Sequence, residues 1–194
     1  MRTPLKLAIA LAATVMITGC GSETTNNTAV IGGESSSSAK TSSNNANPQQ
    51  AASEQAIALV NRYFQTISRL DADPTVTINA VDDVAAGQAL TTAKADVTTR
   101  RSQGIVITGE IKVVDAKAAE VRLDAKPASV QVHACLDIST RDAKFPDGSS
   151  ANAANRNPRV SSQLTVENPS WPDSRGWRVV ADTGKRGGEA CEKA

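Results

Sequence analysis

Hydrophobic positions in the middle of the chain recur with the period of an α-helix. The apolar residues between positions 54 and 70 would form one helical face: Ile57, Val60, Tyr63, Phe64, Ile67 and Leu70. Ser53 suits the N-cap, and Glu54 would lie in the first turn, where the helix dipole favours an acid. The pattern therefore predicts a helix over residues 54–70, ended by the Asp71–Pro74 run.

A second stretch with the same period follows a short segment at residues 75–78. It predicts a helix over residues 80–100, with Asn79 as its N-cap and Gly87 inside it. The buried stripe of this helix would consist of Val81, Val84, Ala85, Leu90, Ala93 and Val97. The folded part of the chain thus begins with two amphipathic helices.

After Gly104 the period changes to two, which is typical of strands with one buried face. Alternating stretches predict strands at residues 105–113, 120–124, 129–139, 160–166 and 177–182. A turn is expected over residues 115–118, and Pro146-Asp147-Gly148 is a second turn signal. The alternation is clearest in the third strand, where one face would carry Val130, Val132, Ala134, Leu136 and Ile138.

Helices followed by a strand meander predict an α+β domain, because strands with one apolar face need helices to cover that face. The order resembles the nuclear transport factor 2-like superfamily. The resemblance is carried by the aspartate-rich corner after the first helix, the long strand from Gly104, the Ala134-Cys135-Leu136-Asp137 run and Trp177-Arg178-Val179.

This resemblance implies N-terminal helices packed on a strongly curved antiparallel sheet that forms a cone. Cones of this superfamily often form homodimers through the outer face of the sheet. The same layout recurs in secreted and lipid-anchored actinobacterial proteins. A cystatin-like sheet around a single helix is the alternative, and the second predicted helix counts against it.

Residues 1–19 have the layout of a secretory signal peptide, with a basic start and an apolar run from Leu7 to Ile17. That run is shorter than the about 20 residues that span a bilayer. Ile17-Thr18-Gly19-Cys20 resembles the lipobox of bacterial lipoproteins, which implies a diacylglyceryl group on the Cys20 sulfur and cleavage before it. We expect an anchor in the cell membrane, on its extracytoplasmic face. The alternative is an ordinary signal peptide with a chance cysteine.

Residues 20–51 are dominated by Ser, Thr, Asn and Gly, and such a stretch buries too little apolar surface to fold. We predict a flexible linker there, followed by a single domain over residues 52–194. Removing Arg2 and Lys6 from 21 basic residues leaves 19 against 20 acidic ones, and the basic residues are scattered, which argues against nucleic acid as a partner. No P-loop, G-x-S-x-G, H-E-x-x-H or dinucleotide glycine motif occurs, and we expect neither cofactor nor metal.

Cys135 and Cys191 remain once Cys20 carries lipid, and paired thiols in an oxidising compartment are expected to bridge. We predict a Cys135–Cys191 disulfide, worth about 4 kcal/mol in the chain-entropy model. The alternative is a redox pair or metal site. It lacks a C-x-x-C motif, and His133 is the only histidine.

Tyr63, His133 and Asp137 are weak catalytic candidates, because some enzymes of the resembled superfamily place such side chains in the mouth of the cone. His133 and Asp137 would share the polar face of one strand, opposite the face that meets the helices. Tyr63 belongs to the helix face. The three groups are therefore not expected to converge, which disfavours catalysis.

Trp171 lies in a proline-flanked loop and is the candidate partner-binding residue, because an exposed tryptophan often anchors a partner. The alternative is a side chain that folds down over the core, where Trp177 is expected. We predict a non-catalytic binding or adaptor domain with an envelope protein as its partner. The alternative is a cone that binds a small apolar molecule, as a receptor or as a weak isomerase- or dehydratase-like enzyme. That alternative requires a cavity on the order of several hundred Å³.

Overall fold

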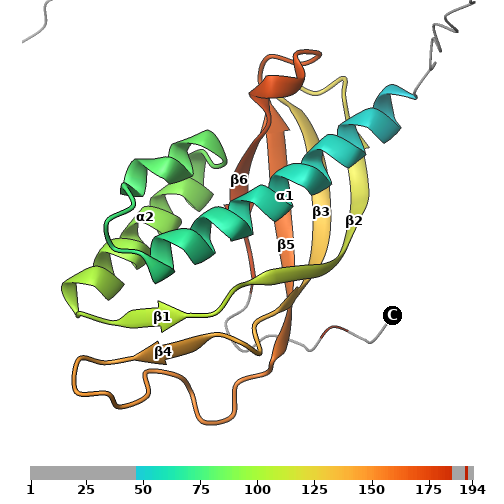
Figure 1. Cartoon of the computed structure of the whole chain (residues 1–194). Coiled ribbons are helices and arrows are strands. Elements are labelled where there is room, and N and C mark those ends of the chain that lie inside the picture. Colours follow the sequence, from blue (N-terminus) through green and yellow to red (C-terminus); the bar gives the residue numbers. More distant parts are fainter. Residues whose placement is uncertain (1–46, 185–190, 192–194) are drawn as a thin grey trace, which may run out of the picture. The chain divides into compact units, whose positions relative to one another are not determined.

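The computed structural model describes residues 47–184 and Cys191, which belong to one compact unit. The expected signal peptide, the lipid-bearing Cys20 and most of the expected linker lie outside the described residues. Helices α1 (Pro48–Ala72) and α2 (Gly87–Ser102) lie on one side of a curved antiparallel sheet (Figure 1). The expected α+β class is confirmed.

The main sheet is antiparallel and has the strand order β2-β3-β5-β6. Its strands are β2 (Lys112–Arg122), β3 (Ala128–Asp137), β5 (Arg159–Asn168) and β6 (Arg178–Asp182). A separate two-stranded ribbon pairs β1 (Val106–Thr108) with β4 (Asp142–Lys144). The main sheet is open, with β2 and β6 at its edges.

Helix α1 begins six residues earlier than expected. The Asn47 side chain caps it by accepting a hydrogen bond from the Gln49 N–H at 3.0 Å. Pro48 occupies the first turn, where its missing N–H costs nothing. Ser53, the expected N-cap, lies inside the helix and donates its hydroxyl to the Gln49 carbonyl. Residues 48–51 are therefore helical rather than part of the linker.

The predicted second helix consists of two elements. The 3-10 helix η1 (Ile78–Asp83) comes first and is capped by Thr77, not by Asn79: the Thr77 hydroxyl accepts from the Asn79 N–H at 3.4 Å. The chain then forms hydrogen bonds beside β6, and α2 begins at Gly87. Gly87 therefore opens α2 instead of lying within it.

The turn expected over residues 115–118 does not exist, because β2 runs through it. The pairing of β2 with β3 shifts between Val113 and Asp115 and again between Ala118 and Glu120. Each extra residue in a bulge moves the alternation by one position. The core-packed side chains accordingly change from odd to even numbers and back: Ile111, Val113, Ala116, Ala118, Val121 and Leu123. Two bulges, not a turn, cause the change of phase.

The predicted long first strand is interrupted at Gly109, which separates β1 from β2. The φ angle of Gly109 is +77°, and a Cβ atom there would lie 2.1 Å from the carbonyl oxygen of Thr140. A position with both features accepts only glycine. This crossing directs β1 away from the main sheet to pair with β4.

The core lies between α1 and the main sheet. The alternation predicted for the third strand is confirmed within β3, since Val130, Val132, Ala134 and Leu136 are all buried. Ile138, the fifth predicted member, follows the end of β3 and is half-buried. The largest fully buried side chains come from both helices, from η1 and from the sheet: Leu59, Val60, Leu70, Val81, Val97, Val130, Val132, Leu164, Val166, Asn168 and Val179. A 3-10 turn, η2 (Ser174–Gly176), leads into β6, and Trp177 beside it is 2% exposed, as expected for a core residue.

Candidate functional site

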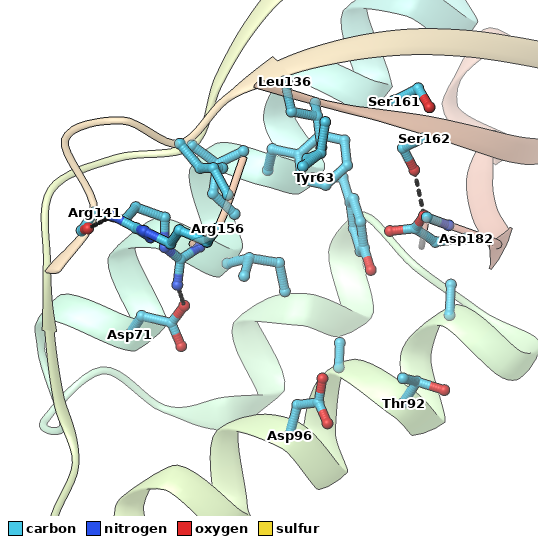
Figure 2. A pocket seen from close by; sticks show the side chains of 18 of the residues that line it. Tyr63, Asp71, Thr92, Asp96, Leu136, Arg141, Arg156, Ser161, Ser162 and Asp182 are labelled. Carbon is cyan, nitrogen blue, oxygen red and sulfur yellow. Dashed lines mark hydrogen bonds and ion pairs between the residues drawn. The ribbon is translucent and has the colours of Figure 1, made fainter. Parts of the chain in front are cut away.

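A cavity of about 610 Å³ lies between α1, α2 and the helix-facing side of the sheet. Small-molecule sites are typically about 300–1,000 Å³ in volume. The apolar part of its lining comes from Tyr63, Phe64, Ile67, Ala89, Ala93, Ile111, Leu136, Ile138 and Val160. Charged side chains lie at two separate parts of the lining (Figure 2). The cavity thus combines an apolar interior with charged groups that can orient a ligand.

Asp71, near the C-terminal end of α1, is held by two arginines. Arg100 of α2 donates to Asp71 Oδ1 from Nε at 3.0 Å and from Nη2 at 2.6 Å. Arg141, in the segment after β3, donates to Asp71 Oδ2 from Nη2 at 2.5 Å. The Asp71 side chain is only 2% exposed, and a buried carboxylate needs such pairing. This triad carries a net charge of +1.

Arg156 lies beside this triad, in the segment between β4 and β5. It donates from Nη2 to the carbonyl oxygen of Arg141 and lines the same cavity. Within residues 47–184 and 191, no carboxylate forms an ion pair with Arg156. Asp96 lies 3.9 Å from Arg100. This end of the cavity, here called the arginine end, therefore holds three guanidinium groups against the carboxylates of Asp71 and Asp96.

The opposite end of the cavity contains Tyr63, Ser162 and Asp182. The Ser162 hydroxyl donates to Asp182 Oδ1, which also accepts from the Gly184 N–H at 3.0 Å. In Figure 2 the Tyr63 hydroxyl points into the space between Asp182 and helix α2. Burial first, and then the charges of Asp182 and Asp96, raise the pKa of Tyr63. The phenol therefore stays protonated at neutral pH and can donate a hydrogen bond to a ligand.

The structure separates the three catalytic candidates. Tyr63 lines the cavity, whereas His133 and Asp137 lie on the other face of β3. Asp137 accepts from the Ser139 N–H at 2.9 Å and lies 4.0 Å from Arg159. Hydrogen bonds from Ser139, followed by the positive charges nearby, lower the pKa of Asp137. His133 and Asp137 therefore cannot act on a molecule held beside Tyr63.

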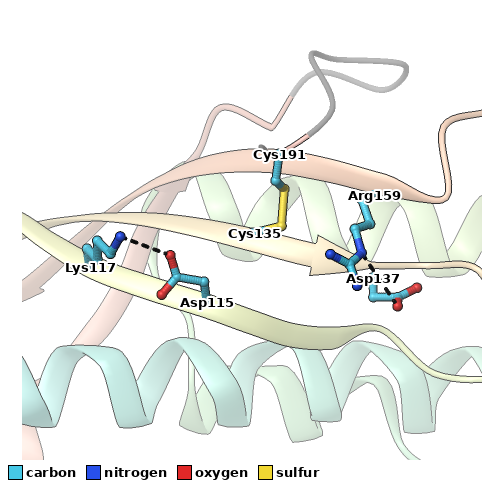
Figure 3. Close-up of a disulfide and its surroundings, with 6 residues drawn as sticks. All are labelled: Asp115, Lys117, Cys135, Asp137, Arg159 and Cys191. Atoms are coloured by element: carbon cyan, nitrogen blue, oxygen red, sulfur yellow. Dashed lines mark ion pairs between the residues drawn. A yellow bond between two sulfur atoms is a disulfide. The ribbon is translucent and has the colours of Figure 1, made fainter. Parts of the chain in front are cut away.

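The predicted disulfide between Cys135 and Cys191 is present, with the two Cα atoms 5.7 Å apart. Figure 3 shows it on the face of the sheet opposite the helices. A hollow of about 410 Å³ beside it is lined in part by Lys117 and His133. The bridge indicates an oxidising, extracytoplasmic compartment. Among the residues that the structure describes, no group of three or more His, Cys, Asp or Glu side chains could hold a metal ion.

Trp171 is half-buried, not exposed as expected. Its ring packs on Trp177 with the ring centroids 5.6 Å apart, and it contributes to the edge of the core. A hollow of about 500 Å³ adjoins it, lined in part by Lys126 and Pro127. The position of Trp171 matches the alternative of a side chain that folds down over the core.

Sequence reasoning missed the arginine end of the cavity. In the sequence, Asp71 belongs to the aspartate-rich corner after the first helix, and Arg100 is one of the scattered basic residues. Arg141 and Arg156 lie in a polar stretch without periodicity. One signal in the sequence pointed to this site: Asp71 directly follows the apolar face of the first helix. A carboxylate buried at that position needs cationic side chains from other parts of the sequence as partners.

None of the helices in the described part of the chain is long and apolar enough to cross a membrane. No family model matches the chain, and no curated protein matches it. Among solved structures, it is similar to the intermembrane space region of the chloroplast protein ARC6. The TM-score is 0.51 at 16% sequence identity, over 69% of this chain and 96% of that chain. At this identity the likeness shows a shared fold, with helices packed on an antiparallel sheet.

Proposed function

We propose that this chain is a lipid-anchored binding protein on the extracytoplasmic face of a bacterial membrane, and that it holds a small molecule in the cavity between α1, α2 and the sheet. The observation that carries this proposal is the cavity itself. It has the volume of a ligand site, an apolar interior and charged groups at both ends.

The address rests on the lipobox-like Ile17–Cys20 run and on the disulfide. A thioether-linked diacylglyceryl group brings two acyl chains, which is what stable anchoring needs. The polar segment after Cys20 would separate the domain from the membrane. We also place the domain in the nuclear transport factor 2-like superfamily. Two helices against one face of an open, curved sheet support this assignment.

Binding without chemistry is the function that these side chains support best. A general base must reach the proton that it abstracts. The carboxylate of Asp71 is occupied by two arginines, and one oxygen of Asp182 accepts two hydrogen bonds. The raised pKa of Tyr63 keeps that group protonated. These groups can orient a ligand through hydrogen bonds and charge.

Two observations favour a small molecule over a protein as the bound partner. Trp171 packs on Trp177, so its ring is not presented freely to a partner surface. The cavity, in contrast, is lined by apolar side chains that no described residue covers completely. An adaptor role would then depend on the bound molecule rather than on Trp171.

Native mass spectrometry of the full chain, extracted gently from a bacterial envelope, tests this proposal. We expect a bound small molecule in the wild type and its loss in Ala93→Phe, because Ala93 is buried and lines the cavity. Ala95→Phe is the matched control, since Ala95 is exposed on the same helix. A wild type without a bound molecule, or equal occupancy in Ala93→Phe, would contradict the proposal. Circular dichroism verifies that each variant is folded.

A further inference from the structure

We infer that the cavity selects ligands that combine an anionic head group with an apolar body, and that Arg156 binds the head group. This inference rests on the proposed function, because it assigns a ligand class to the same cavity. The head group is a carboxylate or a phosphate, since both present the paired oxygens that a guanidinium group recognises.

The charges at the arginine end are unequal. Arg100, Arg141 and Arg156 line it, and Asp71 and Asp96 are the acids beside them. The two oxygens of Asp71 are already used by Arg100 and Arg141. An excess of one positive charge therefore faces the cavity in a partly buried setting, where an anion is attracted more strongly than it would be in bulk water.

Arg156 carries this excess charge. Arg100 and Arg141 are fixed by Asp71, whereas within residues 47–184 and 191 the hydrogen bond of Arg156 goes to a neutral backbone carbonyl. A guanidinium group has five N–H donors in a planar fork that matches carboxylate and phosphate. Because one donor of Arg156 bonds to the Arg141 carbonyl, the group is held in place while its other N–H groups can bind a ligand anion.

The rest of the lining determines the orientation of the ligand. The charge of Asp182 gives the region around Tyr63 a negative character, which repels an anion from that end. Apolar side chains such as Ile67, Leu136 and Val160 line the space between the two ends. The anion is therefore expected at the arginine end, with the apolar body extending toward Tyr63.

Calorimetric titration of the full chain in a mild detergent tests the inference with four probes that share one apolar body: octanoate, octyl phosphate, octanol and octylamine. The variants are Arg156→Gln and, as a matched control, Arg159→Gln. Arg159 lies three positions away and pairs with Asp137 outside the cavity (Figure 3). Both variants remove one positive charge from neighbouring positions. The free concentration of each probe is corrected for its partition into detergent, measured without protein, because affinities are compared between probes as well as between variants.

We expect wild type to bind at least one of the two anions more tightly than octanol, and Arg156→Gln to lose on the order of tenfold in that affinity. The affinity for octanol should not change, and Arg159→Gln should resemble wild type. Arg156→Lys should recover part of the loss, because it keeps the charge but not the fork. The tighter of the two anions identifies the head group.

Two results separate the inference from the proposed function. Equal affinities for all four probes, unaffected by Arg156→Gln but abolished by Ala93→Phe, would overturn the inference and leave a binding cavity. If no probe binds, or if Ala93→Phe does not abolish the binding that is seen, the proposed function is overturned as well. Tighter binding of octylamine than of octanoate would also overturn the inference, because it would assign the site to a cation.

Discussion

Asp71 and Arg141 join the end of α1 to the segment after β3, across 70 positions of sequence, with Oδ2 and Nη2 2.5 Å apart. Arg100 completes the arrangement from α2. One carboxylate thus connects three segments that line the cavity. The Asp71 side chain is 2% exposed and that of Arg141 is 14% exposed, so water screens this pair only weakly.

Asp71→Asn should therefore destabilise the protein strongly. Removing the charge leaves Arg141 without its carboxylate partner and Arg100 with only the longer contact to Asp96. Breaking comparable buried pairs costs about 3–5 kcal/mol. Urea denaturation gives the free energy of unfolding. Asp82→Asn is the control, because the Asp82–Lys94 pair is much more exposed and its loss should cost less than about 1 kcal/mol. Equal losses in the free energy of unfolding for the two variants would mean that the ion pairs of Asp71 do not stabilise the fold more than an exposed pair does.

Gly109→Ala tests the crossing between β1 and β2. Its positive φ and the nearby Thr140 carbonyl both oppose a Cβ atom, so we expect a loss of roughly 2–5 kcal/mol in the free energy of unfolding. Gly148→Ala is the matched control: its φ is +81°, but no atom lies within 4 Å of an added Cβ. It should lose only about 1–2 kcal/mol. Equal losses in the free energy of unfolding for the two variants would show that the Thr140 backbone moves away from the added Cβ atom at no cost.

The parts of this protein that could be predicted from the sequence are those specified by neighbouring residues. The apolar face of α1 and the alternation of β3 depend on side chains a few positions apart, and both are present. The disulfide followed from the number of cysteines and the expected compartment. The start of α1 was missed because Ser53 and Asn47 are both suitable caps, and Pro48 favours the earlier one.

The β2 bulges and the cavity were not predictable in the same way. A change of phase between Val113 and Ala116 has the same appearance in the sequence whether it marks a turn or a bulge; only pairing with β3 distinguishes them. The arginine end is assembled from α1, α2 and two loops. Local pattern carries no information on whether Arg141 and Arg156 meet Asp71, because that depends on the tertiary fold.

The Cys135–Cys191 disulfide should contribute stability without affecting the cavity. Cys191→Ser opens a link across 56 positions of sequence, and we expect it to lower the free energy of unfolding by about 2–4 kcal/mol. Ligand occupancy at temperatures below the transition should stay the same, because the bridge lies on the other face of the sheet. Reductant should shift wild type to the stability of the variant and leave the variant unchanged. Loss of ligand occupancy on reduction would instead show that the disulfide on one face of the sheet affects the cavity on the other face.

Tyr63 is the only tyrosine of the chain, so the near-ultraviolet absorbance of phenolate reports on this residue alone. Burial and the charges of Asp182 and Asp96 raise its pKa in the folded protein above the ordinary value of about 10. Below that pH the phenol is protonated in both states and contributes no pH dependence. Above it the unfolded chain loses the proton while the folded chain keeps it, so stability falls as pH rises.

The limiting slope of this loss is about 1.4 kcal/mol per pH unit for one proton. We therefore expect no phenolate absorbance in the folded protein as the pH passes 10, and its appearance only as the helical circular dichroism signal is lost. Tyr63→Phe should show a shallower alkaline loss of stability, since its other titrating groups are unchanged. Phenolate formation near pH 10 with the fold intact would mean that the Tyr63 hydroxyl is open to water, which would contradict its buried position beside Asp182.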